Sequence, residues 1–289
     1  MNAQGAVALP SVTDIDSILA VLAGQITGQR LRDAQNFARE FVKRLSPEDL
    51  RARSAADWAA LTSGALEFAR ERQAGQAKLR VFSPSAAENG YELPRLVVEI
   101  VTDDMPFLVD SVGLRVAQAG LQLHTVIHPV FRIARDPAGQ LLSLAVEDTA
   151  PGKPESIMHF EIDRAAGAGE LEKLKESIAS TLEDVRACVA DWSAMRAKMI
   201  SIADDLASRN MPIDADGIAE AQEFLRWAAD DNFTFLGYRE YEVARAGNDE
   251  VLQAVAGSGL GILRGEERSL APRSLRTLVA KDLPQSGSM

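Results

Sequence analysis

The 289-residue sequence predicts an α+β protein in which an N-terminal helical segment precedes an antiparallel sheet with helices on one face. Three observations favour this class. Apolar residues recur every three or four positions in the first quarter of the chain, the period changes to that of strands near residue 79, and helical and strand patterns then alternate. A long helix and the start of a second α+β module complete the prediction.

Three helices are expected in residues 1–78. Apolar stripes predict the first over residues 15–26 and the second over 31–45, and Pro47 ends the second because proline cannot continue the hydrogen-bond ladder. Ser54, followed three residues later by Asp57, is typical of a capping box and predicts the start of a third helix. Packing alone explains these helices, so we expect a small bundle or an arm.

The middle of the chain predicts the order strand, helix, strand, strand, strand, helix. After a short strand at 79–82, strands are expected at residues 93–102, 122–135, 140–147 and 156–163. The intervening helix begins at the Asp103–Pro106 turn, where aspartate favours the N-cap and proline the first turn, and ends at Gly120 in a left-handed conformation. This order matches the ferredoxin-like split unit except for its last strand.

The remaining third of the chain predicts a helix over residues 169–209 with near-heptad apolar spacing. Such a helix is either a coiled-coil-like arm or is packed along a sheet. An amphipathic helix at 214–230 and a strand at 233–243 follow. The expected domains are therefore a helical segment at 1–78, an α+β domain at 79–168, a connecting helix at 169–210 and a second α+β module from 211 to 289.

Charge and cysteine content narrow the function classes. With 31 basic and 42 acidic residues the net charge is −11, which argues against a nucleic-acid or anionic-membrane partner because both require a basic surface. The single cysteine, Cys188, cannot form an internal disulfide. No export signal or membrane-spanning run is present in the sequence, so the expected location is the cytoplasm.

Reactive side chains are few, and no catalytic residue is predicted. His124 and His128 lie in one predicted strand, too far apart to bind one metal ion, and histidines bonded to sheet neighbours are the favoured interpretation, with no metal site. The glycines at 257, 259 and 261 resemble a dinucleotide loop, but the third comes one position too early. We therefore expect a turn there and no cofactor site in this chain.

The strongest candidate site is the turn formed by Asp103, Asp104, Met105, Pro106 and Phe107. In this fold the turn between the first strand and helix presents backbone N–H groups to a ligand, and its two aspartates would attract an ammonium group. The functional hypothesis is thus an amino-acid-sensing edge. The alternative is that aspartate only caps its own helix.

Four segments of the sequence together resemble one family. They are DDMPFLVDSVGLRVAQAGLQLHTVIHPVFRIARD (residues 103–136), SIMHFEIDR (156–164), EFLRWAADDNFTFLGYREYEV (223–243) and GSGLGILRG (257–265). They are similar to the N-terminal part of the large bacterial NAD-specific glutamate dehydrogenases, in the same order and spacing over most of residues 79–270.

The resemblance implies ACT-like regulatory modules here and a catalytic Rossmann domain, which binds NAD, in a later part of a longer polypeptide. It implies a parent reaction that converts L-glutamate to 2-oxoglutarate and ammonium in amino-acid catabolism. ACT modules that bind amino acids generally have glycine in the first strand–helix turn, whereas this sequence has Asp-Asp-Met-Pro, which favours assembly over ligand binding.

Two functions are therefore expected. The first is a non-catalytic oligomerisation and regulatory segment, whose partners are further copies of itself and the catalytic half of the same polypeptide. The alternative is an allosteric sensor that binds an amino-acid effector through Asp103–Phe107. The chain alone is expected to be inactive as an enzyme.

Overall fold

A computed structural model describes residues 13–164, 167–209, 213–246 and 249–265. The chain divides into two compact units, residues 1–182 and 183–289, and the boundary falls inside helix α7 (Ala168–Asp205). None of the helices in the described ranges is long and apolar enough to cross a membrane. The fold class is α+β, as predicted.

The first unit begins with four helices in its described part. These are α1 (Ile15–Gln25), α2 (Gly28–Val42), α3 (Pro47–Arg51) and α4 (Ala55–Ala69), and side chains cap the N-terminal ends of all of them except α2. The predicted capping box is confirmed, since Ser54 and Asp57 bond each other's backbone at the start of α4. The short helix α3 was not predicted. Pro47, expected only to end a helix, occupies its first turn, where the missing N–H costs nothing.

One antiparallel sheet follows, and its central strand is the last of that sheet's strands along the chain. The strands are β1 (Lys78–Phe82), β2 (Leu96–Asp103), β3 (Leu123–Ile127), β4 (Val130–Arg135), β5 (Leu141–Ala145) and β6 (Lys153–Ile162). Strand β6 pairs with β2 on one side and with both β3 and β4 on the other, and β1 and β5 lie outermost in the order β1-β2-β6-β4-β5.

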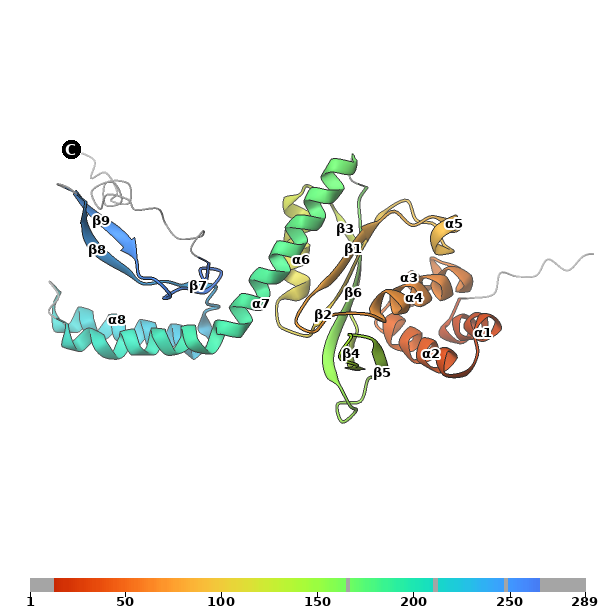
Figure 1. Ribbon diagram of the computed structural model, residues 1–289, viewed down its shortest axis with the longest axis horizontal. Helices are drawn as coiled ribbons and strands as arrows, with labels where there is room; N and C mark the ends of the chain where they lie inside the picture. Colours follow the sequence, from red (N-terminus) through yellow and green to blue (C-terminus); the bar gives the residue numbers. More distant parts are fainter. Residues whose placement is uncertain (1–12, 165–166, 210–212, 247–248, 266–289) are drawn as a thin grey trace, which may run out of the picture. The chain divides into compact units, whose positions relative to one another are not determined.

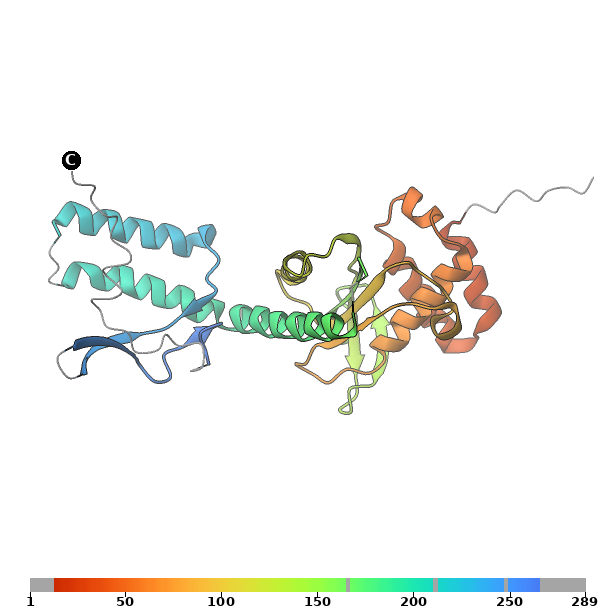
Figure 2. The ribbon, with the colours of Figure 1, turned by 90° about the horizontal axis from the view of Figure 1, so that it is seen from above.

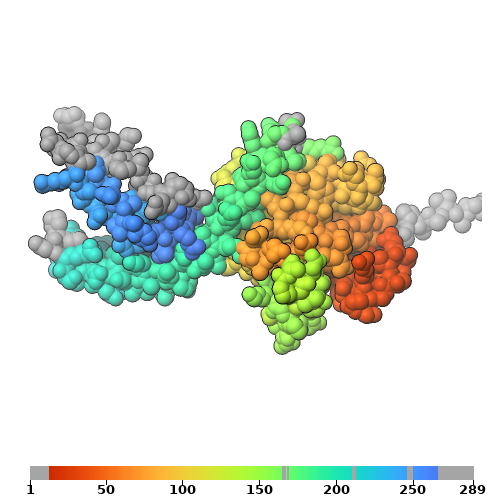
Figure 3. Space-filling view, viewed as in Figure 1, coloured from red at the N-terminus to blue at the C-terminus, as the bar shows by residue number. Residues whose placement is uncertain are grey.

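Helices cover both faces of this sheet (Figures 1 and 2). Helix α6 (Leu108–Gln118) and the first part of α7 lie on one face, where Val112 and Ile178 are completely buried. Helices α1–α4 lie on the other face, and Phe37 stacks on Phe131 of β4 with ring centroids 5.2 Å apart. In the space-filling view these helices rest directly against the sheet (Figure 3).

The N-terminal helices and the sheet therefore share one hydrophobic core. Its members come from α1, α2, α4 and the facing side of the sheet, and include Ile18, Phe37, Phe41, Trp58, Val97, Val101, Phe131 and Ile157. The sequence predicts helices on one face of the sheet, and α6 and the first part of α7 are those helices. The helical segment adds a second helical layer on the opposite face.

The single strand predicted over residues 122–135 is wrong, because the structure has two strands there. His128 and Pro129 separate β3 from β4, and both strands pair with β6. Proline has no N–H to donate to the ladder, although its carbonyl accepts from Ile157 N at 3.1 Å. Gly120 does end α6 with a φ of +74°, as predicted.

The second unit combines the later part of α7 with helix α8 (Ala215–Trp227) and short strands. The strands are β7 (Gly237–Tyr238), β8 (Tyr241–Ala246), β9 (Asp249–Ala254) and β10 (Leu260–Gly261), which pair as β8–β9 and β7–β10. The strand predicted over 233–243 is therefore wrong, since it is split between two different pairings. Arg196 of α7 donates to the Ala229 carbonyl at 2.7 Å, just beyond α8.

Candidate functional site

The predicted site, residues 103–107, connects β2 to α6. Asp103 is the last residue of β2, and the backbone N–H of Asp104 donates to the Pro154 carbonyl at 3.0 Å. Phe107 is the N-cap residue of α6, with a left-handed φ of 70°, and its side chain is 50 % exposed. The expectation that aspartate caps this helix is wrong. Helix α6 begins only at Leu108 and has no side-chain cap, because both aspartates are engaged elsewhere.

Asp103 is held by an arginine from the end of the helical segment. Arg72, 4 % exposed, donates from Nη2 to Asp103 at 2.7 Å and from Nε to Glu155 at 2.9 Å. Arg135 donates to Glu155 from Nε and Nη2, both at 2.8 Å. Burial raises the pKa of Glu155, but the bonds from Arg135 and Arg72 outweigh it, and the pKa lies below its usual value. The turn is thus tied to the N-terminal helices by a buried ionic network.

Asp104 belongs to a second chain of hydrogen bonds. Ser156 of β6 donates to Asp104 Oδ1 at 2.7 Å, and the same hydroxyl lies 2.8 Å from His128 Nε2. Burial lowers the pKa of His128, Asp104 acts in the opposite direction and Arg44 adds to the lowering, so the imidazole favours its neutral form. Asp104 itself remains exposed to solvent.

An open pocket of about 460 Å³ lies at this edge of the unit, and we call it the edge pocket. Its apolar lining comes from Phe41 and Leu45 at the end of α2 and from valines of the sheet and α6, and Glu40, Arg44 and His128 supply the polar groups. Such a combination of apolar surface and a few polar groups is typical of small-molecule sites. His128 lines the edge pocket and is connected through the Ser156 hydroxyl to Asp104 of the turn.

A buried ionic cluster that the sequence did not predict lies on the sheet face covered by α1–α4. His159 of β6 is completely buried, with Nδ1 3.2 Å from Glu99 Oε1 and Nε2 3.5 Å from Glu161 Oε1. Burial lowers the pKa of His159, but the two carboxylates outweigh it and raise the pKa above its usual value. Arg53 pairs with Glu161, whose pKa falls to about 2 even though burial acts to raise it.

His124 and His128 bond to neighbouring residues, as the sequence predicts, His124 to Asp163 at 2.7 Å and His128 to Ser156, and His159 contacts Glu99. In the described ranges no group of three or more potential ligands could hold a metal ion. In the glycine-rich turn near residue 260, the backbone N–H of Gly261 already has a partner within the protein, since it donates to the Asp191 carboxylate at 2.8 Å.

The sheet with α6 and α7 on one face defines an ACT-like α+β domain. Residues 37–178 match the family model described as glutamate dehydrogenase, ACT1 domain. That range includes α4 and the sheet, which contribute buried residues to the shared core.

Curated relatives give the same result. The chain is 33 % identical over 246 residues to the NAD-specific glutamate dehydrogenase of Halomonas elongata, covering 84 % of this chain and 15 % of the relative. The Pseudomonas aeruginosa enzyme is 33 % identical over 226 residues, 77 % of this chain and 14 % of the relative. The Mycobacterium tuberculosis enzyme is 29 % identical over 175 residues, 60 % of this chain and 10 % of the relative.

These matches confirm the predicted resemblance, and the chain belongs to the NAD-specific glutamate dehydrogenase family. It spans 10–15 % of the length of these curated relatives.

Proposed function

We propose that this chain is a non-catalytic regulatory and assembly segment of a larger NAD-dependent glutamate dehydrogenase that acts in the cytoplasm. The observation that supports it most directly is the match to an ACT1 domain within a chain that covers about 15 % of its relatives. The parent reaction would be L-glutamate, NAD and water giving 2-oxoglutarate, ammonium and NADH, with the residues that bind NAD and glutamate outside this chain.

Enzyme assays of the isolated chain test the first half of this proposal. With NAD and L-glutamate present, we expect no NADH to form, as followed by its absorbance. A reproducible rate that depends on protein concentration and is abolished by His124→Ala would contradict it.

Self-association through the exposed residues around the turn is the assembly half of the proposal. Phe107 is 50 % exposed, and Val126, Val130 and Val146 of the edge pocket are 37–40 % exposed. Exposed apolar patches of this kind often mark protein interfaces. The partners would be further copies of the chain and the catalytic half of the same polypeptide.

Sedimentation equilibrium over a wide concentration range tests assembly. We expect the chain to associate and Phe107→Ser to weaken the association. The matched control is Val243→Ser in β8 of the second unit, which is 60 % exposed and should change nothing. A chain that stays monomeric at high concentration, together with an intact parent assembly after deletion of this segment, would refute the idea.

An amino-acid sensor is the second candidate, and the edge pocket beside the turn favours it. Arg44 could bind a carboxylate and the valines an apolar side chain. Asp104 does not line the pocket but is linked through Ser156 to His128, which does, and could bind the ammonium group. A ligand that binds only the folded chain raises its melting temperature. A panel of twenty amino acids at millimolar concentration should include one that does so, and the rise should be smaller in Asp104→Asn and Arg44→Gln. No shift with any of them would count against a sensor.

A further inference from the structure

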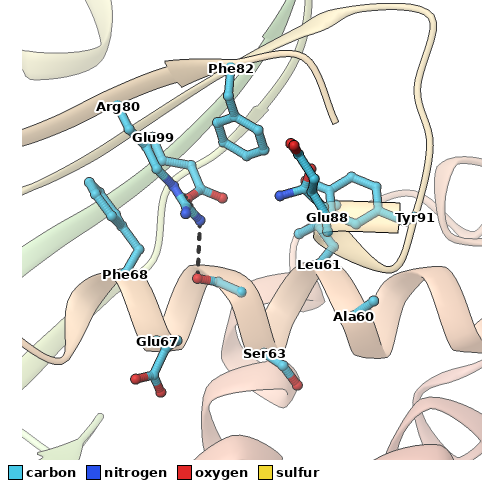
Figure 4. Close-up of a pocket in the computed structure, with 12 residues that line it drawn as sticks. Ala60, Leu61, Ser63, Glu67, Phe68, Arg80, Phe82, Glu88, Tyr91 and Glu99 are labelled. Atoms are coloured by element: carbon cyan, nitrogen blue, oxygen red, sulfur yellow. Dashed lines mark hydrogen bonds and ion pairs between the residues drawn. The ribbon is translucent and has the colours of Figure 1, made fainter. Parts of the chain in front are cut away.

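A second pocket, of about 650 Å³, lies between helix α4, strand β1 and the segment around helix α5 (Ala86–Asn89); we call it the α4 pocket. Helix α4 forms its floor with Ala60 and Leu61. Figure 4 shows Arg80 and Phe82 on one side of the space above this helix and Glu88 and Tyr91 on the other. Its volume is in the range of small-molecule sites.

Arg80 is fixed in place but keeps hydrogen-bonding capacity. Its guanidinium carbon lies 4.5 Å from the Phe68 ring centroid and 4.6 Å from that of Phe82, so the group is held between two aromatic rings. Nε donates to Glu99 at 2.7 Å and Nη2 donates to the Gly64 carbonyl at 3.1 Å. No hydrogen bond within the described ranges uses Nη1, and this atom is not among the fully buried unpaired ones. Two N–H groups are therefore open to the pocket.

Tyr91 supplies a second polar group on the opposite wall. The residue is only 4 % exposed, and the described residues give its hydroxyl no hydrogen-bond partner. Because that oxygen is not among the fully buried unpaired atoms, it is open to the pocket it lines. Burial raises the pKa of Tyr91, so the hydroxyl stays protonated and can donate. A ligand acceptor in the pocket would give this hydroxyl a hydrogen-bond partner.

Arg80 lines the pocket together with three carboxylates, Glu67, Glu88 and Glu99, so the charges behind the pocket matter for its ligand. Glu99, which pairs with Arg80, also contacts His159, and His159 contacts Glu161. Glu161 in turn pairs with Arg53 and Arg95. The connected group therefore contains three arginines and one histidine of raised pKa against two carboxylates, which offsets the two further carboxylates, Glu67 and Glu88, that line the pocket. Recognition of an anion then depends on the unused N–H groups of Arg80.

We propose that the α4 pocket binds a small organic carboxylate with an apolar body and a hydrogen-bond acceptor at its far end. The carboxylate pairs with the Nη1 side of Arg80, the body packs against Phe82 and Leu61, and the acceptor receives the Tyr91 hydroxyl. This site is separate from the turn at 103–107 and does not depend on that turn having a ligand.

Calorimetric titration of the whole chain with three probes tests the proposal. The probes are 3-phenylpropionate, 3-(4-hydroxyphenyl)propionate and phenethylamine. We expect both acids to bind at millimolar concentration, the hydroxylated acid several-fold tighter, and the amine not to bind. Failure of both acids to bind, or a preference for the amine, would overturn the proposal.

Two conservative variants locate the binding. Tyr91→Phe keeps the aromatic ring and should remove the higher affinity of the hydroxylated acid. Arg80→Lys keeps a cation beside Glu99 and should lower the affinity for both acids about tenfold, because lysine lacks the planar guanidinium fork. Glu48→Gln in α3 is the control, since this exposed carboxylate does not line the pocket. Unchanged affinities in both variants would refute the site, and their circular dichroism verifies that each is folded.

Discussion

Replacing Glu155 by glutamine tests whether the buried ionic network holds the N-terminal helices to the sheet. Glu155 is 2 % exposed and receives charged N–H groups from Arg72 and Arg135 at 2.8–2.9 Å. Without its charge, two buried guanidinium groups lose their common partner. Breaking one side of a buried ion pair costs about 3–5 kcal/mol, and the glutamine oxygen retains some of the bonds. We therefore expect a loss of about 3 kcal/mol.

Urea unfolding at neutral pH, followed by circular dichroism, measures this loss. The control is Glu67→Gln, whose side chain is 73 % exposed in an ion pair with Arg70 and should alter stability by less than about 0.5 kcal/mol. The effect should also depend on pH. Because the folded-state pKa of Glu155 is lowered, its contribution is present above pH 4.5 and is lost as the pH falls through the folded pKa.

The difference in the free energy of unfolding between the wild-type chain and Glu155→Gln should therefore become smaller in acid. A loss below about 1 kcal/mol at neutral pH would show that the arginines find other partners, and the reasoning would fail.

Further substitutions test other features. His159 has a raised pKa, so its contribution is complete below pH 6.5 and is lost as the pH rises through the folded value; His159→Gln should therefore destabilise the chain more at pH 6.5 than in alkali, as urea titrations at both pH values can measure. Gly152→Ala should cost at least about 2 kcal/mol in the same assay, because φ is +106° and a Cβ would lie 2.3 Å from the Ile133 backbone. Phe107→Gly should raise the melting temperature, since glycine tolerates the φ of 70° and the gain is up to about 1 kcal/mol. Ser54→Ala should lower it by removing the cap of α4, a loss of about 1 kcal/mol.

Apolar periodicity predicted most elements of the first unit because each has one strongly buried face. Strand β2, helix α6 and helix α7 fall where the sequence places them. The break inside residues 122–135 had a local signal in Pro129, which a continuous strand rarely contains. The left-handed Phe107 had none, because aromatic residues seldom adopt a positive φ and only the surrounding fold enforces it.

The buried charges were visible in part. Glu155, His159 and Glu161 occupy odd-numbered positions of β6, and this spacing puts them on one face of the strand. Glu99 is likewise a charged residue within a run of apolar ones in β2. Their partners could not be predicted, since the pairing of Arg72 with Glu155 joins residues 83 positions apart and depends on the register of the sheet. The α4 pocket, built from a helix, a strand and a loop, depends on the same tertiary arrangement.

The position of β6 at the centre of the sheet has a consequence for how the chain folds. The β1–β2 and β4–β5 hairpins can form as soon as their residues are synthesised, but they meet only when residues 153–162 insert between them. Non-local pairing of this kind is slow because the intervening chain must first be ordered. Until then the inner edges of β2, β3 and β4 are unpaired and open to wrong pairing. We expect nascent chains that stop before residue 153 to be aggregation-prone, and those that reach residue 182 to fold cooperatively.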